Sequence, residues 1–319
     1  LGALELAALS RDEPAAPEAA RRLAGEHPLR WMQAAARAEA RVWLATRGAQ
    51  SGAGPASPGA PWQAPLWGLG RGFALEQPDR WGGLVDLPPD EDSGAAEALL
   101  ATIDAADGED QVAWRSGQRL VARLAHDKAP PPASVAFRPD ATYLVTGGHG
   151  GLGLVVARWI VERGARHVAL LGRRSDPAAD GVRALEALGA RVHALHGDVA
   201  DARAMARLLA RLRDEAPALR GVMHAAADLD SAPVGEITAA QLARMLRPKL
   251  DGSVVLERLT RDAGLDFLVL FSSTTALLGA SGLAHYAAAN AFLDALALAT
   301  DAPRRRVMAV NWGTWEVMR

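Results

Sequence analysis

The chain has 319 residues, 50% of them hydrophobic and 23% charged, and its formal net charge is −2 at pH 7. These values are typical of a soluble globular protein of one large or two ordinary domains. The balance of 35 basic and 37 acidic residues gives no electrostatic reason to expect nucleic acid or an anionic membrane as a partner. The absence of cysteine excludes disulfides, thiol catalysis and cysteine-ligated metals, and we expect no metal site. No signal peptide or 18-residue apolar stretch is evident, so we expect a cytoplasmic protein.

The first third of the chain shows a mixed pattern of short elements. We expect strands at 41–46 and 83–87, helices at 66–76 and 94–105, and hairpin arms at 111–114 and 119–124. The run Gly68-Leu69-Gly70-Arg71-Gly72 does not follow a strand in a βαβ unit, which favours helix packing over phosphate binding. Segments 49–65 and 128–139 are rich in proline and small residues and predict irregular linkers, the second marking a domain boundary.

After this boundary, strand-like runs alternate with helical patterns of 10 to 20 residues. The helical patterns include 153–163 and 201–215. The expected strands are 142–146, 167–171, 191–195, 221–224, 266–271 and 306–311. This alternation predicts an α/β fold with a doubly wound parallel sheet of the Rossmann type.

The first of these strands runs directly into a glycine-rich turn and then a helix. Glycines permit a tight turn and let backbone N–H groups approach a pyrophosphate at a helix N-terminus. The candidate cofactor residues of this turn are Thr146, Gly147, Gly148, His149, Gly151, Leu152 and Gly153. For His149, a surface loop histidine and a phosphate ligand are both open interpretations.

The end of the second strand bears on the type of cofactor. NAD sites usually place an acidic residue there, whereas this chain has Arg173 and Arg174. Two guanidinium groups suit the 2′-phosphate of NADPH, although a solvated basic loop would have the same sequence. Later strand ends supply the further candidates Asp198, Val199, His224, Ala225 and Ala226. Asp198 would either flank the adenine or cap the following helix.

Four polar side chains near the fifth strand suit the reduction of a carbonyl. Tyr286 and Asn290 are four residues apart and therefore share one face of a helix, while Ser273 ends the strand. The tyrosine can donate a proton to the carbonyl oxygen, and the serine can hold that oxygen. Lys249, on the preceding helix, would lower the pKa of the phenol through its positive charge. Each residue alone could equally be a packing or surface residue.

These motifs together resemble a known family. Thr146-Gly147-x-x-x-Gly151-x-Gly153, with Ser273 thirteen residues before Tyr286, resembles the short-chain dehydrogenase/reductase superfamily. Most members carry lysine four residues after the tyrosine, whereas this chain has Asn290 there and Lys249 upstream. That exchange is similar to the ketoreductase domains of modular type I polyketide synthases. The segments 286–294, 246–252, 66–71 and 81–86 match the same subfamily, so the resemblance covers nearly the whole chain.

The resemblance implies specific roles. Tyr286 would be the acid, Ser273 would hold the β-keto oxygen, and Lys249 with Asn290 would complete a catalytic tetrad. The substrate would be a β-ketoacyl chain on an acyl carrier protein, the cofactor NADPH, and the partners neighbouring synthase domains. Residues 1–137 would form a smaller, truncated Rossmann-like structural subdomain without cofactor. Residues 138–319 would form the catalytic NADPH-binding subdomain, and we expect the family's lid and last strand to be absent from this range.

Three departures from the family pattern are present. Leu229-Asp230-Ser231 is an incomplete form of the Leu-Asp-Asp motif of B-type, D-hydroxy-forming members, and Leu278 stands where A-type members carry tryptophan. The run that starts at His224 has alanine where glycine is usual. Two other functions stay open: a weak or inactive ketoreductase-like scaffold, and a free-standing short-chain dehydrogenase that acts on a small ketone or alcohol.

Overall fold

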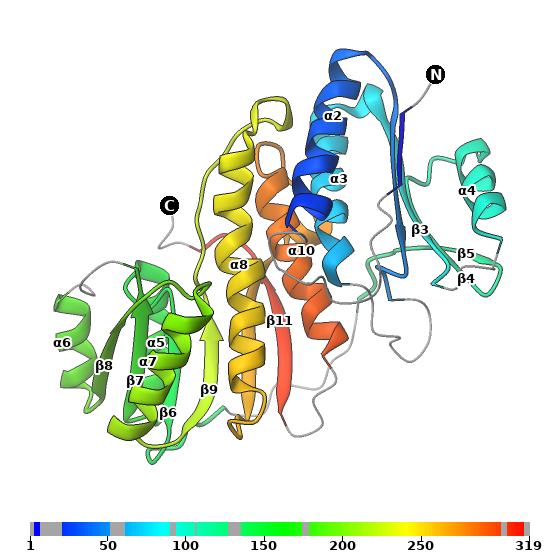
Figure 1. Cartoon of the computed structure of the whole chain (residues 1–319). Helices are drawn as coiled ribbons and strands as arrows, with labels where there is room; N and C mark the ends of the chain where they lie inside the picture. The colour runs from blue at the N-terminus through cyan, green and yellow to red at the C-terminus, as the bar shows by residue number, and fades with distance from the viewer. Residues whose placement is uncertain are drawn as a thin grey trace. The chain divides into compact units, whose positions relative to one another are not determined.

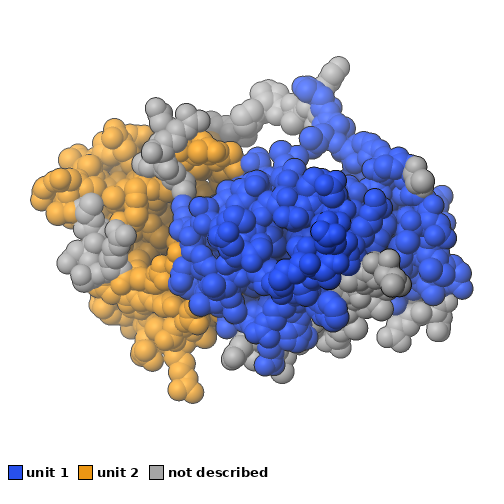
Figure 2. Space-filling model, turned by 90° about the horizontal axis from the view of Figure 1, so that it is seen from above, with its two compact units in different colours: residues 1–127, 229–246, 272–300 blue, residues 128–228, 247–271, 301–319 orange. Residues whose placement is uncertain are grey.

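The computed structural model describes residues 3–6, 21–51, 61–89, 94–105, 107–126, 135–173, 179–300 and 305–315. The chain divides into two compact units, each built from three segments (Figure 2). Unit 1 comprises Leu1–Asp127, Leu229–Leu246 and Ser272–Thr300, and unit 2 comprises Lys128–Asp228, Arg247–Phe271 and Asp301–Arg319. The domain boundary between residues 137 and 138 stays a prediction. None of the helices in the described part of the chain has the length and apolarity needed to cross a bilayer.

A six-stranded sheet forms the centre of unit 2 (Figure 1). Its strands are β6 (Thr142–Thr146), β7 (His167–Gly172), β8 (Arg191–His196), β9 (Leu219–His224), β10 (Phe267–Ser273) and β11 (Arg306–Trp312). They lie in the order β11-β10-β9-β6-β7-β8, and β6 pairs in parallel with both β7 and β9. This is the order of a doubly wound Rossmann sheet, in which the direction of winding reverses next to the first strand. The predicted fold class and all six predicted strands are confirmed.

Helices connect these strands as a parallel sheet requires, since each crossover needs a long connection. They are α5 (Gly151–Glu162), α6 (Ala179–Ala187), α7 (Ala202–Glu215) and α8 (Ala239–Thr260), whose later part belongs to unit 2. The core contains fully buried residues of both layers, such as Val145 and Leu170 on the strands and Ile160 on α5. The inner strands β6, β7 and β10 are buried and mainly apolar because both of their faces are covered, whereas the edge strands β8 and β11 are largely half-buried or exposed.

Unit 1 contains a smaller sheet in the order β1-β2-β3-β4-β5. Its strands are β1 (Ala3–Leu6), β2 (Val42–Arg47), β3 (Trp81–Leu87), β4 (Gln111–Arg115) and β5 (Gln118–Val121). The first four are parallel, whereas β4 and β5 form an antiparallel hairpin around Ser116 and Gly117, as predicted. The smaller Rossmann-like subdomain predicted for the N-terminal half is therefore confirmed as a mainly parallel sheet with helices.

The helices of unit 1 come from distant parts of the sequence. They are α2 (His27–Arg37), α3 (Ala64–Glu76), α4 (Ala95–Asp104), α9 (Thr275–Leu278) and α10 (Ala284–Ala299). The sequence prediction missed α2, although Pro28 at its start and the buried positions Leu29, Met32 and Ala35 follow a helical spacing. Predicted linker residues 52–60 and 128–134 lie outside the described residues.

Two glycines allow α3 and α10 to pack backbone against backbone (Figure 1). A Cβ atom at Gly68 would lie 2.3 Å from the backbone of Ala287, and one at Gly72 would lie 2.4 Å from the Cβ of Ala284. Any side chain at these positions would force the helices apart. The prediction that these glycines serve helix packing is confirmed, and the helix they hold carries Tyr286.

Candidate active site

The glycine turn of unit 2 joins the end of β6 to the start of α5. Gly147 has φ +71°, a backbone conformation that side chains disfavour. A Cβ atom at Gly153 would lie 2.2 Å from the carbonyl oxygen of Gly147, so the first turn of the helix rests directly on the loop. The N-cap position is Gly150, which has no side chain to bind the first N–H groups of α5. The turn is therefore a cradle that fits a pyrophosphate.

Hydrogen bonds around Thr146 and His224 fix the strand ends next to this turn. The Thr146 hydroxyl lies 2.7 Å from Nδ1 of His224, and it accepts a hydrogen bond from the Ala226 N–H. The Ala225 N–H donates to the Thr146 carbonyl. His224 is fully buried, and burial, followed by the charge of Lys249, lowers the pKa of its ring to about 3. A neutral imidazole thus links the ends of β6 and β9.

His149 is not a surface residue. Its side chain is 8% exposed, and Nε2 lies 3.1 Å from the carbonyl oxygen of Leu170. A Cβ atom at Gly172 would lie 2.4 Å from the His149 ring, so glycine is required there to admit the imidazole. The interpretation of His149 as a surface loop histidine is therefore wrong, because the ring fastens the turn to β7. Its predicted contact with the cofactor stays a prediction.

Arg173 follows β7 and presents an exposed guanidinium. Its side chain is 64% exposed and lies 3.5 Å from the Asp228 carboxylate, an ion pair that solvent weakens. Arg173 is therefore available to a phosphate at the end of this strand. Arg174, the second predicted arginine, lies outside the described residues.

Asp198 does not cap α7. Its carboxylate accepts from the Ala200 N–H at 2.9 Å and forms an ion pair with Arg247 at 3.0 Å. The N-cap of α7 is Asp201, whose side chain accepts from the Ala204 N–H. The capping interpretation of Asp198 is therefore wrong, because the N-cap of α7 lies three residues further along the chain. A role for Asp198 and Val199 beside the adenine stays a prediction.

Ser273, Tyr286 and Asn290 come together in unit 1. Tyr286 lies in the first turn of α10, and the Asn290 side chain donates to its carbonyl oxygen at 2.8 Å. The side chains of Ser273 and Asn290 both interact with the phenol. Asn290 is fully buried, and its Oδ1 has no hydrogen-bond partner among the described residues. The predicted sharing of one helix face by Tyr286 and Asn290 is confirmed.

Burial sets the protonation state of the phenol. It raises the pKa of Tyr286 above its ordinary value of 10, and hydrogen bonds from Asn290 and Ser273 oppose this shift only in part. Within unit 1, desolvation of the phenolate outweighs the polar neighbours, and the expected lowering of this pKa by the charge of Lys249, which belongs to unit 2, stays a prediction. The phenol is fully protonated at neutral pH and can serve as a proton donor.

Lys249 is held in unit 2, on α8 as predicted. Its side chain is 2% exposed, and Nζ donates to the Phe271 carbonyl oxygen at 2.7 Å. Phe271 precedes Ser272 and Ser273 on β10. An ammonium this deeply buried requires fixed acceptors, since burying an unpaired charge is costly. The position of Lys249 relative to Tyr286 stays a prediction.

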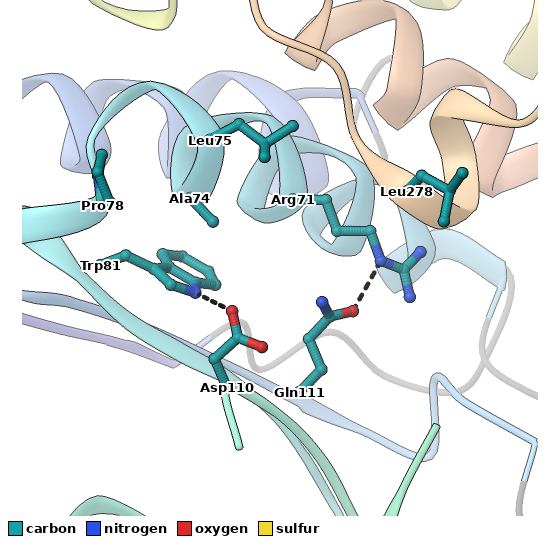
Figure 3. A pocket seen from close by; sticks show the side chains of 8 residues that line it. All are labelled: Arg71, Ala74, Leu75, Pro78, Trp81, Asp110, Gln111 and Leu278. Atoms are coloured by element: carbon teal, nitrogen blue, oxygen red, sulfur yellow. Dashed lines mark hydrogen bonds between the residues drawn. The ribbon is translucent and has the colours of Figure 1, made fainter. Parts of the chain in front are cut away.

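A separate pocket of about 300 Å³ lies in unit 1 between α3 and the start of β4 (Figure 3). Arg71 extends along it and donates to Gln111 at 2.9 Å, and Trp81 donates to Asp110 at 2.7 Å. Burial lowers the pKa of Arg71 to about 10, partly offset by Asp294 and Asp110. None of the predicted catalytic residues lines this pocket, so it is not the candidate active site.

The strand order and the glycine cradle define a dinucleotide-binding protein of the Rossmann class, and the Ser-Tyr-Asn set adds the polar groups of a carbonyl reductase. The chain belongs to the KR (ketoreductase) domain family, which it matches over residues 141–317. Residues 3–124 match the Rossmann fold domain of the polyketide synthase extender module SpnB. It is thus a ketoreductase domain of the polyketide synthase type, as the sequence resemblance implied.

Similar proteins agree with this assignment. The chain is 43% identical over 281 residues to polyketide synthase GfsA of Streptomyces halstedii, and 40% identical over 294 residues to the pikromycin synthase component PikAIII of Streptomyces venezuelae. These matches cover 86% and 89% of this chain but 4% and 19% of the synthases, so the chain spans a small part of their length.

Solved structures show the same likeness. An A1-type ketoreductase is 44% identical with a TM-score of 0.80, covering 90% of this chain and 62% of that one. A C2-type ketoreductase from a modular polyketide synthase is 39% identical with a TM-score of 0.87, covering 99% of this chain and 69% of that one.

Proposed function

We propose that this domain uses NADPH to reduce a β-ketoacyl thioester on an acyl carrier protein to the β-hydroxyacyl thioester during polyketide chain extension. The observation that carries the proposal is the grouping of Ser273, Tyr286 and Asn290, with a phenol that stays protonated at neutral pH. Membership of the ketoreductase family supports the reaction class, and the similar polyketide synthases support the type of substrate.

The residues of unit 2 suit NADPH. The N-terminal turn of α5 would bind the pyrophosphate, since its glycine cradle leaves the first N–H groups of the helix open. Arg173, exposed at the end of β7, would bind the 2′-phosphate through its guanidinium fork. When bound, the reduced nicotinamide supplies the hydride for the carbonyl carbon.

The side chains of unit 1 would bind and protonate the β-keto oxygen of the substrate. Ser273 donates a hydrogen bond that holds the β-keto oxygen, and Tyr286 transfers its phenolic proton to this oxygen as the C–O bond becomes an alcohol. The phenolate left behind must be reprotonated. The Asn290 Oδ1, which has no hydrogen-bond partner within the described residues, can accept from a water molecule or an ammonium, and we assign the resupply of the proton to Asn290 with Lys249.

Two other proteins would fit much of the same sequence: a scaffold without activity, and a dehydrogenase for small alcohols. A scaffold would bind NADPH without oxidising it, whereas a dehydrogenase would prefer free ketones or alcohols to carrier-bound substrates. The N-terminal match to a polyketide synthase domain over residues 3–124 favours the synthase reading over a free-standing enzyme.

The decisive experiment follows NADPH oxidation with a β-ketoacyl thioester, free and on an acyl carrier protein, beside Tyr286→Phe. We expect this variant to bind NADPH like the unchanged domain and to lose at least about 100-fold in rate, in line with general acid catalysis. Tyr143→Phe is the matched control, because it removes the hydroxyl of the other tyrosine in the chain. An unchanged rate for Tyr286→Phe contradicts the assignment of the proton donor.

A further inference from the structure

Glu76, the last residue of α3, joins two chain segments that are far apart in the sequence. Its Oε1 accepts a hydrogen bond from the Gly282 N–H at 2.8 Å, and its Oε2 accepts one from the Val234 N–H at 2.6 Å. Hydrogen bonds to an ionised acceptor are among the strong ones in proteins. One half-buried carboxylate thus binds two loops that lie 158 and 206 residues further along the chain.

The two loops also bind each other. The Ala232 N–H donates to the Gly282 carbonyl oxygen at 2.9 Å, so both polar groups of residue 282 are engaged. Gly282 has φ +74°, a conformation that few other residues would adopt. From α2, the Gln33 amide donates to the carbonyl oxygens of Val234 and Ile237, both at 2.9 Å. Glu76 thus belongs to one hydrogen-bonded cluster that also contains Gln33 of α2 and the loops at residues 232–237 and 282.

This hydrogen-bonded cluster lies immediately before α10, the helix that carries Tyr286. Gly282 is two residues ahead of α10, and the Ala287 N–H donates to the Leu283 carbonyl oxygen at the first turn. Tyr286 belongs to that turn, where few hydrogen bonds within the helix restrain the backbone. A carboxylate at the N-terminal end of α10 is also favourable because it opposes the helix dipole.

The first turn of α10 is also restrained by packing against α3. The close contacts of Gly68 and Gly72 with Ala287 and Ala284 fix the distance between α3 and α10. Close packing fixes the separation of the two axes, whereas hydrogen bonds at the helix start fix the conformation of the chain that leads into it. The carboxylate of Glu76 supplies that second restraint.

We infer that Glu76 is a positioning residue for the reduction: it holds the first turn of α10, and thereby the phenol of Tyr286, in the orientation that donates to the substrate oxygen. The inference rests on the proposed function. Glu76 does not take part in the proton transfer itself, so its loss changes the rate of the reduction without removing the acid.

The test compares Glu76→Gln with the unchanged domain in NADPH titrations and in turnover of a β-ketoacyl thioester. The amide keeps the shape of the carboxylate but accepts only through one oxygen, so one loop N–H faces an NH₂ group. We expect kcat per NADPH-binding site to fall at least about tenfold, since small misplacements of reacting groups carry penalties of this size. The Kd for NADPH should stay within about twofold, because the cofactor residues lie in unit 2.

Two further measurements separate positioning from a merely structural role. The share of the minor alcohol stereoisomer should rise in Glu76→Gln, because a carbonyl that is held less firmly exposes both of its faces to hydride. Asp79→Asn, which removes an exposed carboxylate three residues further on, should change neither quantity. If too little Glu76→Gln folds, Glu76→Asp serves instead, since it keeps the charge and withdraws both oxygens by one methylene.

The inference fails if kcat per NADPH-binding site stays within twofold of the unchanged domain. It also fails if turnover and the number of NADPH-binding sites fall in the same proportion, since that pattern reports only a loss of folded protein. Absence of NADPH oxidation by the unchanged domain would overturn the proposed function instead. Hydrogen exchange of the Gly282 and Val234 amides would then decide about Glu76, with faster exchange in Glu76→Gln expected and unchanged exchange against it.

Discussion

Replacing Asp86 in unit 1 should cost considerable stability for a small change in side-chain shape. It ends the run Trp-Gly-Gly-Leu-Val-Asp on β3 and is fully buried. Its Oδ1 accepts from the Thr46 hydroxyl at 2.6 Å and from the Ala49 N–H at 2.9 Å, while its Oδ2 accepts from the Gln50 N–H at 2.9 Å and from Arg115. Asp86→Asn alters one atom in this arrangement.

The cost follows from the number of donors left without an acceptor. Whichever way the new amide turns, its NH₂ group faces two of the four donors, and the charge opposite Arg115 is lost. Breaking a buried charge pair by removing one partner costs about 3–5 kcal/mol. The Arg115 side chain is 18% exposed, so water can solvate part of its charge, and we take the lower end, about 3 kcal/mol. At about 2 kcal/mol per molar urea, the unfolding midpoint of unit 1 should fall by about 1.5 M.

Tryptophan fluorescence during urea unfolding can measure this shift. Trp67 donates from Nε1 to the Thr46 hydroxyl at 3.0 Å, so one of the chain's nine indoles lies directly beside the hydrogen bonds of Asp86. NADPH binding should be unchanged at low urea, because the residues proposed to bind the cofactor belong to unit 2. Asp107→Asn, which removes an exposed ion pair with Arg119, is the control and should leave the midpoint nearly unchanged. Equal midpoints for Asp86→Asn and the control would refute the reasoning.

Three further predictions concern unit 2 and the phenol. Gly153→Ala places a Cβ atom 2.2 Å from the Gly147 carbonyl oxygen, so NADPH affinity in a fluorescence titration should fall at least about tenfold, whereas undiminished affinity would show that the cradle adapts. The pKa of His224 is about 3 in the folded protein and about 6.5 when unfolded, so the unfolded chain takes up a proton first as the pH falls. The unfolding free energy should therefore decrease from pH 6.5 downward, and His224→Asn should flatten that slope; equal slopes would be evidence against a neutral buried ring. Because burial raises the pKa of Tyr286, the phenol should stay protonated up to about pH 10, and the reduction rate should not fall through its deprotonation below that pH. A loss of rate that titrates below pH 9 would contradict this.

Sequence patterns were sufficient wherever the cause is local. The alternation of apolar strands and helices predicted all six strands of the larger sheet, and the glycine turn after β6 was placed correctly. The spacing of Tyr286 and Asn290 placed both on α10. Such features depend on the periodicity of a helix or strand and on glycine's backbone freedom, which a short stretch of sequence contains in full.

The sequence failed where the partner of a residue is distant. His149 is buried because Leu170 and Gly172 of the next strand accept its ring, and the pKa of Tyr286 rises because the surrounding chain excludes water. The residues next to His149 and Tyr286 in the sequence do not predict that either side chain is shielded from water. Desolvation is a property of the folded packing and depends on residues far away in the sequence.

By itself, then, the sequence determined the class of fold, the glycine turn and the candidates for the reacting groups, since these depend on residue types at fixed short spacings. Only the tertiary structure decided what holds them: the glycines of α3 against α10, and Glu76 between Gly282 and Val234. These contacts join residues about 160 to 220 positions apart, and folding alone brings them within hydrogen-bond or van der Waals distance.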